Sequence, residues 1–390
     1  MPPPGRYNRE TMRFLHTSDW HLGRSLFVAP LLEDQAFVLD QMVDLIRDSR
    51  IDCVLLAGDV YDRSLAPVDA VRLLDDVLLR IVVGERVPVV MISGNHDSAD
   101  RLGFGASLLA GGGLHVVSGC ARIVTLGDGH GAVDVVAIPY AEPSIVRTRL
   151  GDEMIVDHDS ALMADLGCEG AQPAKGRRNV AVAHAFVTGG AETESERPLS
   201  VGGSGSVRAA CFDGFCYTAL GHLHRPQHVQ RPDLRYSGSL LKYSFAEADH
   251  AKSVTIVDMD GRGACSLEHV SLRPRRDVRV IEGEMAALIA AARDDAARHD
   301  YVLAILTDRG AILDAAGKLR QVYPNCLHVA RKSFAADVAE QRRHDPRRHT
   351  EDELFGAFFE EVTGQPPTPA ERDVFTATVA EVRIREQEAA

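Results

Sequence analysis

Short polar blocks follow runs of aliphatic residues at several points in the first 224 residues of the chain. The apolar runs are 14–15, 54–56, 89–92 and 180–182, the blocks after them are 18–21, 58–63, 94–97 and 183–185, and a fifth block is 221–224. Apolar runs bounded by glycine and polar residues are typical of buried strands. Because ligands of open α/β sheets collect at the carboxyl ends of strands, the five blocks are expected to meet at one site.

Seven side chains in these blocks are of types that bind metal ions: Asp19, His21, Asp59, Asn95, His184, His222 and His224. Seven donors are too many for one tetrahedral site but suit two neighbouring ions. The set holds four imidazoles, two carboxylates and one amide, without a thiolate. This chemistry favours manganese, iron or zinc over magnesium and calcium, which prefer oxygen. We therefore expect two divalent metal ions, with Mn²⁺ as the first choice.

A pair of ions needs a bridging carboxylate, and Asp59 is assigned that role. The remaining ligands divide into two sets, which are Asp19, His21 and His224 for one ion and Asn95, His184 and His222 for the other. Two ions about 3.5–4 Å apart neutralise charge on the phosphate and on the leaving oxygen, so hydrolysis of a phosphodiester is the natural use of such a centre.

His96 and Asp62 are the candidate catalytic residues beside the metals. The side chain of His96 is expected to point away from that of Asn95, because adjacent side chains leave a turn in different directions. An imidazole can protonate a leaving alkoxide, so His96 is the candidate general acid. Asp62 is expected to accept a hydrogen bond from the other ring nitrogen of His96 and fix its tautomer. The alternative is that Asp62 only caps the helix that follows.

Each block has an ordinary structural explanation when it is taken alone. A single Asp-x-His or Gly-His-x-His occurs at solvated strand ends, and Gly-Asn-His-Asp also forms a common turn. The ordered combination of all five blocks after strand-like runs is what indicates a metal centre.

The order Asp-x-His, Gly-Asp-x-x-Asp, Gly-Asn-His-Asp, His and Gly-His-x-His resembles the calcineurin-like metallophosphoesterase superfamily, and within it the SbcD-type nuclease subunits of double-strand-break repair. The likeness extends to SERPLSVGG at 195–203, FDGF at 212–215, ALGHLHRPQ at 219–227 and YSGS at 236–239, so it covers most of residues 12–272. Archaeal and eukaryotic members carry His where this chain has Asp62, whereas the bacterial subunits resemble this chain.

The resemblance implies a metal-dependent nuclease of DNA repair and recombination. The activities expected from it are ATP-dependent exonuclease digestion of double-stranded ends and endonuclease cleavage of single strands and hairpins. The implied partners are DNA and an SbcC-type, SMC-like ATPase. Homodimerisation through the early helices is a further family expectation.

Composition places the 390-residue chain among soluble globular proteins, with 25% charged and 45% hydrophobic residues. Seven cysteines without a Cys-x-x-Cys pair indicate reduced thiols and a cytoplasmic location. No signal peptide and no run of about 20 apolar residues is visible, so no membrane association is expected. The net charge of −13 is unusual for a DNA enzyme, but local potential steers a polyanion more than net charge does. Candidate phosphate contacts near the blocks are Arg24, Arg101, Arg225 and Lys242.

The blocks lie in a predicted two-metal phosphoesterase domain, residues 12–272, of α/β class with a four-layer α/β/β/α sandwich. Helical patterns at 33–50 and 67–83 and a hairpin pattern at 122–138 support two sheets covered by helices. The segment 188–206 is rich in Gly, Glu and Ser, which predicts a long surface loop.

The C-terminal part contains two further predicted units. Residues 273–340 show a β-α-β-α-β pattern, which by resemblance is a capping domain over the active site and otherwise a plain stabilising appendage. After a basic linker at 341–349, residues 350–390 show two short amphipathic helices. By resemblance this pair binds the coiled coil of the ATPase, and the alternative is that it packs on its own chain.

Two other functions fit part of the sequence. A small-molecule metallophosphodiesterase needs the same two-metal site, but it leaves the C-terminal part without a role. A non-catalytic adaptor has no physical need for a complete ligand set. The nuclease-subunit hypothesis accounts for the blocks and the C-terminal part together.

Overall fold

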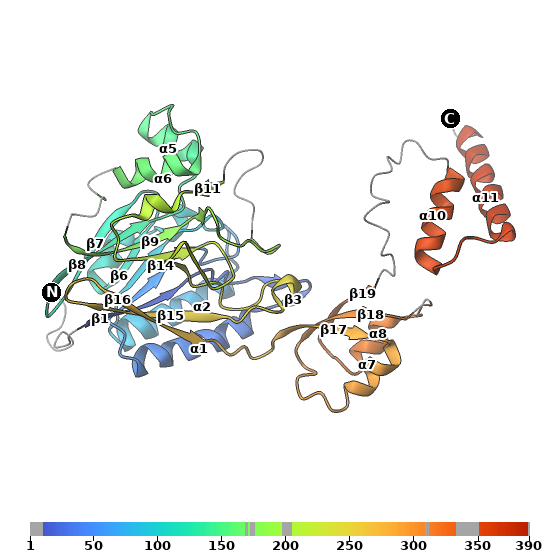
Figure 1. Cartoon of the computed structure of the whole chain (residues 1–390), viewed down its shortest axis with the longest axis horizontal. Helices are drawn as coiled ribbons and strands as arrows, with labels where there is room; N and C mark the ends of the chain where they lie inside the picture. The colour runs from blue at the N-terminus through green and yellow to red at the C-terminus, as the bar shows by residue number, and fades with distance from the viewer. Residues whose placement is uncertain are drawn as a thin grey trace. The chain divides into compact units, whose positions relative to one another are not determined.

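The computed structural model describes residues 11–167, 171, 176–196, 205–308, 310, 312–332 and 351–388. The chain divides into two compact units, Met1–Val278 and Arg279–Ala390 (Figure 1). The predicted linker at 341–349 and residues 197–203 of the SERPLSVGG motif lie outside the described residues. Each unit is described by itself.

One mixed sheet of the first unit has six strands in the order β16-β15-β1-β4-β5-β6. Their bounds are β1 Thr11–Thr17, β4 Cys53–Leu56, β5 Val89–Ile92, β6 Leu114–Val117, β15 Ser253–Asp260 and β16 Cys265–Ser271. β1, β4, β5 and β6 run parallel, whereas β15 and β16 are antiparallel to their neighbours. Every residue of β4 and β5 is buried, which explains their unbroken apolar sequences.

A second six-stranded sheet has the order β13-β14-β12-β9-β8-β7. Its strands are β7 Arg122–Asp128, β8 Gly131–Ile138, β9 Arg178–His184, β12 Tyr217–Gly221, β13 Gln227–Val229 and β14 Arg231–Tyr236. β8, β9, β12 and β14 are parallel, and β7 and β13 are antiparallel at the two edges. The hairpin expected at 122–138 is confirmed as β7 and β8.

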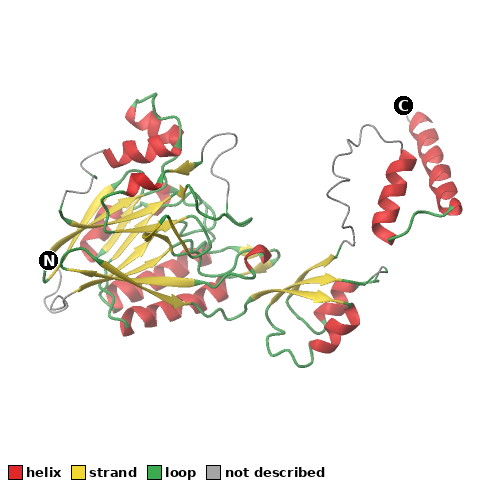
Figure 2. Cartoon of the chain, in the orientation of Figure 1, coloured by secondary structure: helices red, strands yellow, loops and turns green. Residues whose placement is uncertain are grey.

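The inner faces of the two sheets form one apolar core. Phe14 and Leu55 from the first sheet belong to the same buried cluster as Val135 and Val182 from the second. Helices lie on the outer faces (Figure 2). They are α1 Leu32–Asp48 and α2 Val68–Leu78 beside the first sheet, and α5 Pro143–Leu150 and α6 His158–Gly167 beside the second. The α/β class with mixed sheets is therefore confirmed.

Shorter elements complete the first unit. The β2 Ser25–Leu26 and β3 Ala29–Pro30 pair is antiparallel, and the β10 Phe186–Val187 and β11 Ser206–Val207 pair is parallel. α2 continues as a π-helical stretch, Leu79–Gly84, so the helical pattern at 67–83 is confirmed as two joined elements. The short helices are α3 Ala99–Leu102, α4 Ala106–Leu109 and the 3₁₀ segments Ala110–Gly112, Ala209–Phe212 and Phe245–Glu247.

Strand ends bring the polar blocks to one edge of the unit. β1, β4 and β5 end one or two residues before the starts of their blocks at Ser18, Gly58 and Gly94. In the other sheet, β9 ends at His184, which pairs in register with Gly221 at the end of β12. The parallel strands of both sheets thus place residues from distant parts of the sequence side by side.

The second unit begins with a three-stranded sheet. Its elements are β17 Val278–Gly283, α7 Met285–Ala291, β18 Tyr301–Leu306, α8 Ala315–Arg320 and β19 Cys326–Arg331. The order is β17-β18-β19, and β18 and β19 are parallel. This is the β-α-β-α-β sequence of elements that the pattern predicts.

The last two helices are α10 Glu351–Thr363 and α11 Pro369–Glu388. The Phe355 and Phe375 rings stack at 4.0 Å between centroids with planes 6° apart, so the apolar faces of the two helices meet each other. Phe358 remains 64% exposed. Among the described residues, no helix combines the length and apolar character needed to cross a membrane.

The segment after β16 stays attached to the first unit. Arg276 Nη2 donates to Asp34 Oδ2 of α1 at 2.6 Å, and the buried Asp34 carboxylate receives a second bond from Arg276 Nε at 2.9 Å. A compact boundary falls after Val278, whereas the boundary at Leu272, drawn from sequence, stays a prediction.

Candidate metal centre

Carboxylates and imidazoles at or just after the ends of β1, β4, β5, β9 and β12 converge in the first unit. Three overlapping groups have ligand atoms within 4.8 Å of one another: Asp19, His21 and His224; Asp19, Asp59 and His184; and His21, Asp62 and His96. The first two groups are fully buried. All seven residues expected to be ligands lie at or next to this cluster.

Asp59 lies between the two sets of donors. Its Oδ2 is 3.6 Å from His21 Nε2 on one side and 3.6 Å from His184 Nε2 on the other. His184 Nε2 is also 2.9 Å from Asn95 Oδ1. This central position is what a carboxylate shared by two ions requires.

The imidazoles have ring nitrogens without a proton or without a hydrogen-bond partner at the cluster of proposed metal ligands. His184 Nδ1 donates to the carbonyl of Ala57 at 2.9 Å, which leaves its Nε2 without a proton and able to bind a metal ion. His21 Nε2 and His224 Nε2 lie 3.1 Å apart. His21 Nδ1 and His222 Nε2 are buried without a hydrogen-bond partner among the described residues. Buried polar atoms normally have partners, so this donor set fits bound cations.

Burial governs protonation in the cluster. It lowers the pKa of His21, His184 and His222, which keeps these imidazoles neutral. Burial and the neighbouring Asp59 carboxylate raise the pKa of Asp19 well above its usual value. Metal ions bind neutral imidazoles and ionised carboxylates. The positive charge of bound ions would offset the repulsion between the Asp19 and Asp59 carboxylates.

The backbone at the ligands is strained. Asp19, His21, Asp59 and His222 have positive φ angles of 52°, 43°, 48° and 112°. Such conformations cost about 1–3 kcal/mol each in residues other than glycine and persist only where surrounding structure enforces them. Their concentration on four proposed ligands marks this edge of the sheets as a functional site.

Gly94 is required because the backbone before Asn95 passes directly over Asp59. A Cβ at Gly94 would lie 2.1 Å from Asp59 Oδ1 and 2.3 Å from Asp59 N, closer than any real contact. We expect Gly94→Ala to displace Asp59 and reduce the affinity for Mn²⁺, measured by calorimetric titration, by about tenfold or more. Gly111→Ala is the control, because a Cβ there has no neighbour within 4 Å. Equal Mn²⁺ affinity in the two variants would show that Gly94 has no such role.

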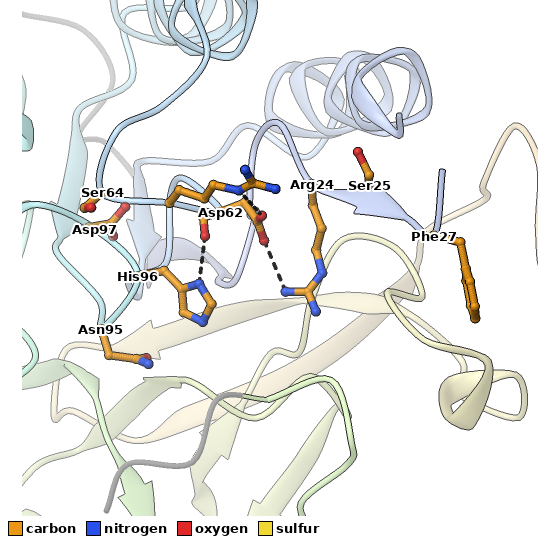
Figure 3. A pocket seen from close by; sticks show the side chains of 9 residues that line it. Arg24, Ser25, Phe27, Asp62, Ser64, Asn95, His96 and Asp97 are labelled. Carbon is orange, nitrogen blue, oxygen red and sulfur yellow. Dashed lines mark hydrogen bonds and ion pairs between the residues drawn. The ribbon is translucent and has the colours of Figure 1, made fainter. Parts of the chain in front are cut away.

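His96 belongs to the third group, which is only partly buried, and lies beside the two fully buried groups. Its backbone N–H donates to Asp59 Oδ1 at 2.9 Å, and its ring lies edge-on to the His21 ring with centroids 4.7 Å apart. Its Nδ1 is 2.8 Å from the backbone carbonyl oxygen of Asp62 (Figure 3). Since a carbonyl can only accept, Nδ1 carries the proton and Nε2 is left without one in the neutral ring.

Asp62 therefore accepts the expected hydrogen bond from His96, but through its main-chain carbonyl and not through its carboxylate. The carboxylate turns the other way and accepts from Arg24 Nη1 at 3.2 Å (Figure 3). The helix-capping alternative is also wrong, since α2 begins after Pro67 and has no side-chain cap.

A polar cavity of about 540 Å³ opens beside His96. Its lining includes Arg24, Phe27, Arg63, Ser64, Asn95 and His96. Of the candidate phosphate contacts Arg24, Arg101, Arg225 and Lys242, Arg24 lines this cavity. The Lys242 ammonium pairs with Asp277 Oδ1 at 2.9 Å and its side chain is 11% exposed, and its contact with a phosphate stays a prediction.

Asp97 supports the site in a way that sequence reasoning missed. Its carboxylate accepts N–H groups from Val60 at 3.1 Å, Tyr61 at 2.9 Å and Gly94 at 2.8 Å, and so ties the second block to the third. Burial and the nearby Asp59 raise the pKa of Asp97 to about 7. Asp97 could have been identified from the sequence, because it is the last residue of the Gly-Asn-His-Asp block.

Comparison with known families agrees with this geometry. A family model described as calcineurin-like phosphoesterase matches residues 12–226, which include every proposed ligand. A second model, the type 5 capsule protein repressor C-terminal domain, matches residues 274–363. The SbcD subunit of the nuclease SbcCD from Staphylococcus saprophyticus is 31% identical over 358 residues, which span 91% of this chain and 94% of that protein. This chain belongs to the SbcD-type calcineurin-like phosphoesterases.

Solved structures resemble this SbcD-type chain more distantly. A dimetal phosphatase from Danio rerio is 14% identical, with a TM-score of 0.39, and the match covers 68% of this chain and all of that one. The GAP50 anchor of the Plasmodium inner membrane complex is 14% identical, with a TM-score of 0.38, and the match covers 68% and 90% of the two chains.

Proposed function

We propose that this chain is the nuclease subunit of an SbcCD-like complex and hydrolyses phosphodiester bonds in DNA. The observation that carries the proposal is the position of His96, between a buried cluster of metal donors and a polar cavity that contains Arg24. The nuclease subunit from Staphylococcus matches nearly the full length of this chain, which supports a DNA substrate and a partner ATPase.

The proposed ligands divide around Asp59. Asp19, His21 and His224 would hold one ion, Asn95, His184 and His222 the other, and Asp59 would contact both. When bound, two divalent ions, for which we propose Mn²⁺, supply positive charge at the phosphate and lower the pKa of a water molecule. The neutral imidazoles and the mixture of nitrogen and oxygen donors favour Mn²⁺ over Mg²⁺.

His96 is proposed as the general acid. The Asp62 carbonyl holds the proton on Nδ1, so protonation of Nε2 gives an imidazolium that can pass a proton to the leaving oxygen. The Asp62 carboxylate orients Arg24, whose guanidinium also stacks over the Tyr243 ring at 5.0 Å. Arg24 is thereby fixed at the cavity wall, where it would contact a phosphate of the DNA.

The C-terminal parts are proposed to select DNA and recruit the ATPase. Residues 273–340 would act as the capping domain, and residues 350–390 as the helix pair that binds the coiled coil of the ATPase. The exposed Phe358 and Val362 on α10 supply an apolar surface suited to a helical partner. The domain comprising residues 12–272 would carry the chemistry.

The decisive experiment is Mn²⁺-dependent cleavage of a blunt, end-labelled DNA duplex. The chain is assayed with and without an SbcC-type ATPase and ATP, and bis-p-nitrophenyl phosphate serves as a small diester. We expect duplex digestion that depends on the partner and ATP. Cleavage of the small diester without DNA cleavage under any condition would favour a small-molecule phosphodiesterase.

Truncation after Val278 separates these two functions further, because the first unit ends there. The truncated chain should keep hydrolysis of bis-p-nitrophenyl phosphate within about threefold, since every proposed ligand lies in the first unit, and the diester is smaller than the cavity. Its partner-dependent digestion of duplex DNA should fall to background. Undiminished duplex digestion by the truncated chain would leave the second unit without the proposed role.

A further inference from the structure

A buried ion pair lies directly behind His224, one of the proposed ligands. Glu247 ends a short 3₁₀ segment, Phe245–Glu247, and is 0% exposed. Its Oε2 accepts from Lys252 Nζ at 2.5 Å, and Lys252 is 6% exposed. Neither residue belongs to the five polar blocks, and neither lines the cavity beside His96.

Both members of the pair contact His224. Glu247 Oε1 lies 3.2 Å from His224 Nδ1, and Lys252 Nζ donates to the His224 carbonyl at 2.7 Å. Lys252 also donates to Ser239 Oγ at 2.9 Å. A buried charge pair is costly unless its remaining hydrogen-bonding capacity is used, and here each member of the pair makes one contact with His224.

Ser195 shows which ring nitrogen of His224 carries the proton. Its hydroxyl lies 2.7 Å from His224 Nδ1 and donates to Glu247 Oε1 in a short hydrogen bond. A hydroxyl has one proton, and a carboxylate only accepts. Since the Ser195 proton goes to Glu247, Nδ1 must be the donor to Ser195 and Glu247. His224 Nε2 is therefore bare on the side that faces His21.

We propose that Glu247, held by Lys252, is a positioning residue that fixes His224 as the Nδ1–H tautomer and aims its bare Nε2 at the metal centre. This inference rests on the proposed ligand role of His224. A carboxylate behind a ligating histidine raises the basicity of the ring and prevents its rotation, and removing such a partner typically reduces metal affinity about 10–100-fold.

Glu247→Gln tests the proposal with calorimetric titration of Mn²⁺ into the metal-free chain. The amide keeps the size of the side chain but removes the charge that pairs with Lys252, so we expect the Kd for Mn²⁺ to rise about 10–100-fold. The control is Asp128→Asn, which removes the charge that pairs with Arg178 at 2.6 Å. Arg178 is the first residue of β9 and His184 is the last, so this ion pair lies at the other end of the strand from the metal centre. Its Kd should stay within about twofold of wild type.

The titrations separate three outcomes. A wild-type chain that binds no Mn²⁺ contradicts the metal centre itself. Binding by wild type with an unchanged Kd in Glu247→Gln overturns the role of Glu247 and leaves the proposed function standing. An equal loss of Mn²⁺ affinity in Asp128→Asn would show that the loss in Glu247→Gln reflects general destabilisation. That outcome also overturns the proposal.

A measurement on the wild-type chain covers the case in which Glu247→Gln does not fold. Long-range ¹H–¹⁵N spectra of the metal-free chain report the tautomer of each histidine, and His224→Asn assigns the His224 signals by their loss. We expect the Nδ1–H form. A dominant Nε2–H form of His224 overturns the inference.

Discussion

Replacement of His96 with alanine should reduce cleavage of a DNA duplex by about 10²–10⁴-fold, the usual contribution of a general acid. Metal binding should survive, because His96 contacts Asp59 through its backbone N–H, which alanine retains. The measurement pairs single-turnover cleavage of end-labelled duplex with determination of bound manganese by mass spectrometry. Activity should recover more on a diester with a good leaving group, since such a substrate needs little proton donation.

His228→Ala is the matched control for that variant. His228 is an exposed residue of β13 whose ring lies outside the metal cluster and outside the cavity lining. Cleavage and metal content should both remain at the wild-type level. If His96→Ala lost as much manganese as a ligand variant, the division between ligands and acid would be wrong.

Asp59→Ala should remove both bound metal and activity. The carboxylate stands 3.6 Å from imidazole nitrogens of both donor sets, so its loss weakens both halves of the centre. We expect manganese content to fall from about two ions per chain to less than one, with DNA cleavage at background. The increase in Tm that Mn²⁺ gives to wild type should largely disappear, because metal stabilises only the fold that binds it.

Without metal, Asp59→Ala should not lower the stability of the chain. Repulsion from Asp59 contributes to the raised pKa of Asp19, so removing Asp59 relieves that repulsion. Metal-free Asp59→Ala should therefore unfold at a temperature no lower than metal-free wild type. The exposed Asp48 provides the control, and Asp48→Ala should leave manganese content and the effect of Mn²⁺ on Tm unchanged. A large loss of Tm in metal-free Asp59→Ala would assign the residue to the fold rather than to metal.

The arrangement of strand ends could be predicted from sequence because two simple patterns coincide there. Continuous apolar runs such as Val89–Ile92 require burial on both faces, and polar residues immediately after them must lie at the sheet edge. Parallel pairing then brings His184 and Gly221 into register. The hairpin of β7 and β8 followed from its glycine-containing turn.

Other contacts could not be predicted, because they depend on the direction of a side chain after a turn. Asp62 offers a carbonyl and a carboxylate within one residue, and the sequence does not say which one faces His96. The Lys252 and Glu247 pair lies 28 and 23 residues from His224 and follows no metal-binding spacing. Long-range packing alone decides such contacts.

The order of the ligands along the chain has a consequence for biosynthesis. Asp19 precedes His222 by 203 residues, and the strand before Asp19 pairs with β15 near the end of the first unit. A ribosome adding about 5–20 residues per second needs roughly 10–40 s to cover that interval. Throughout this time the nascent chain lacks at least two of its seven proposed donors, so the metal centre cannot be completed until more than half of the polypeptide has been synthesised.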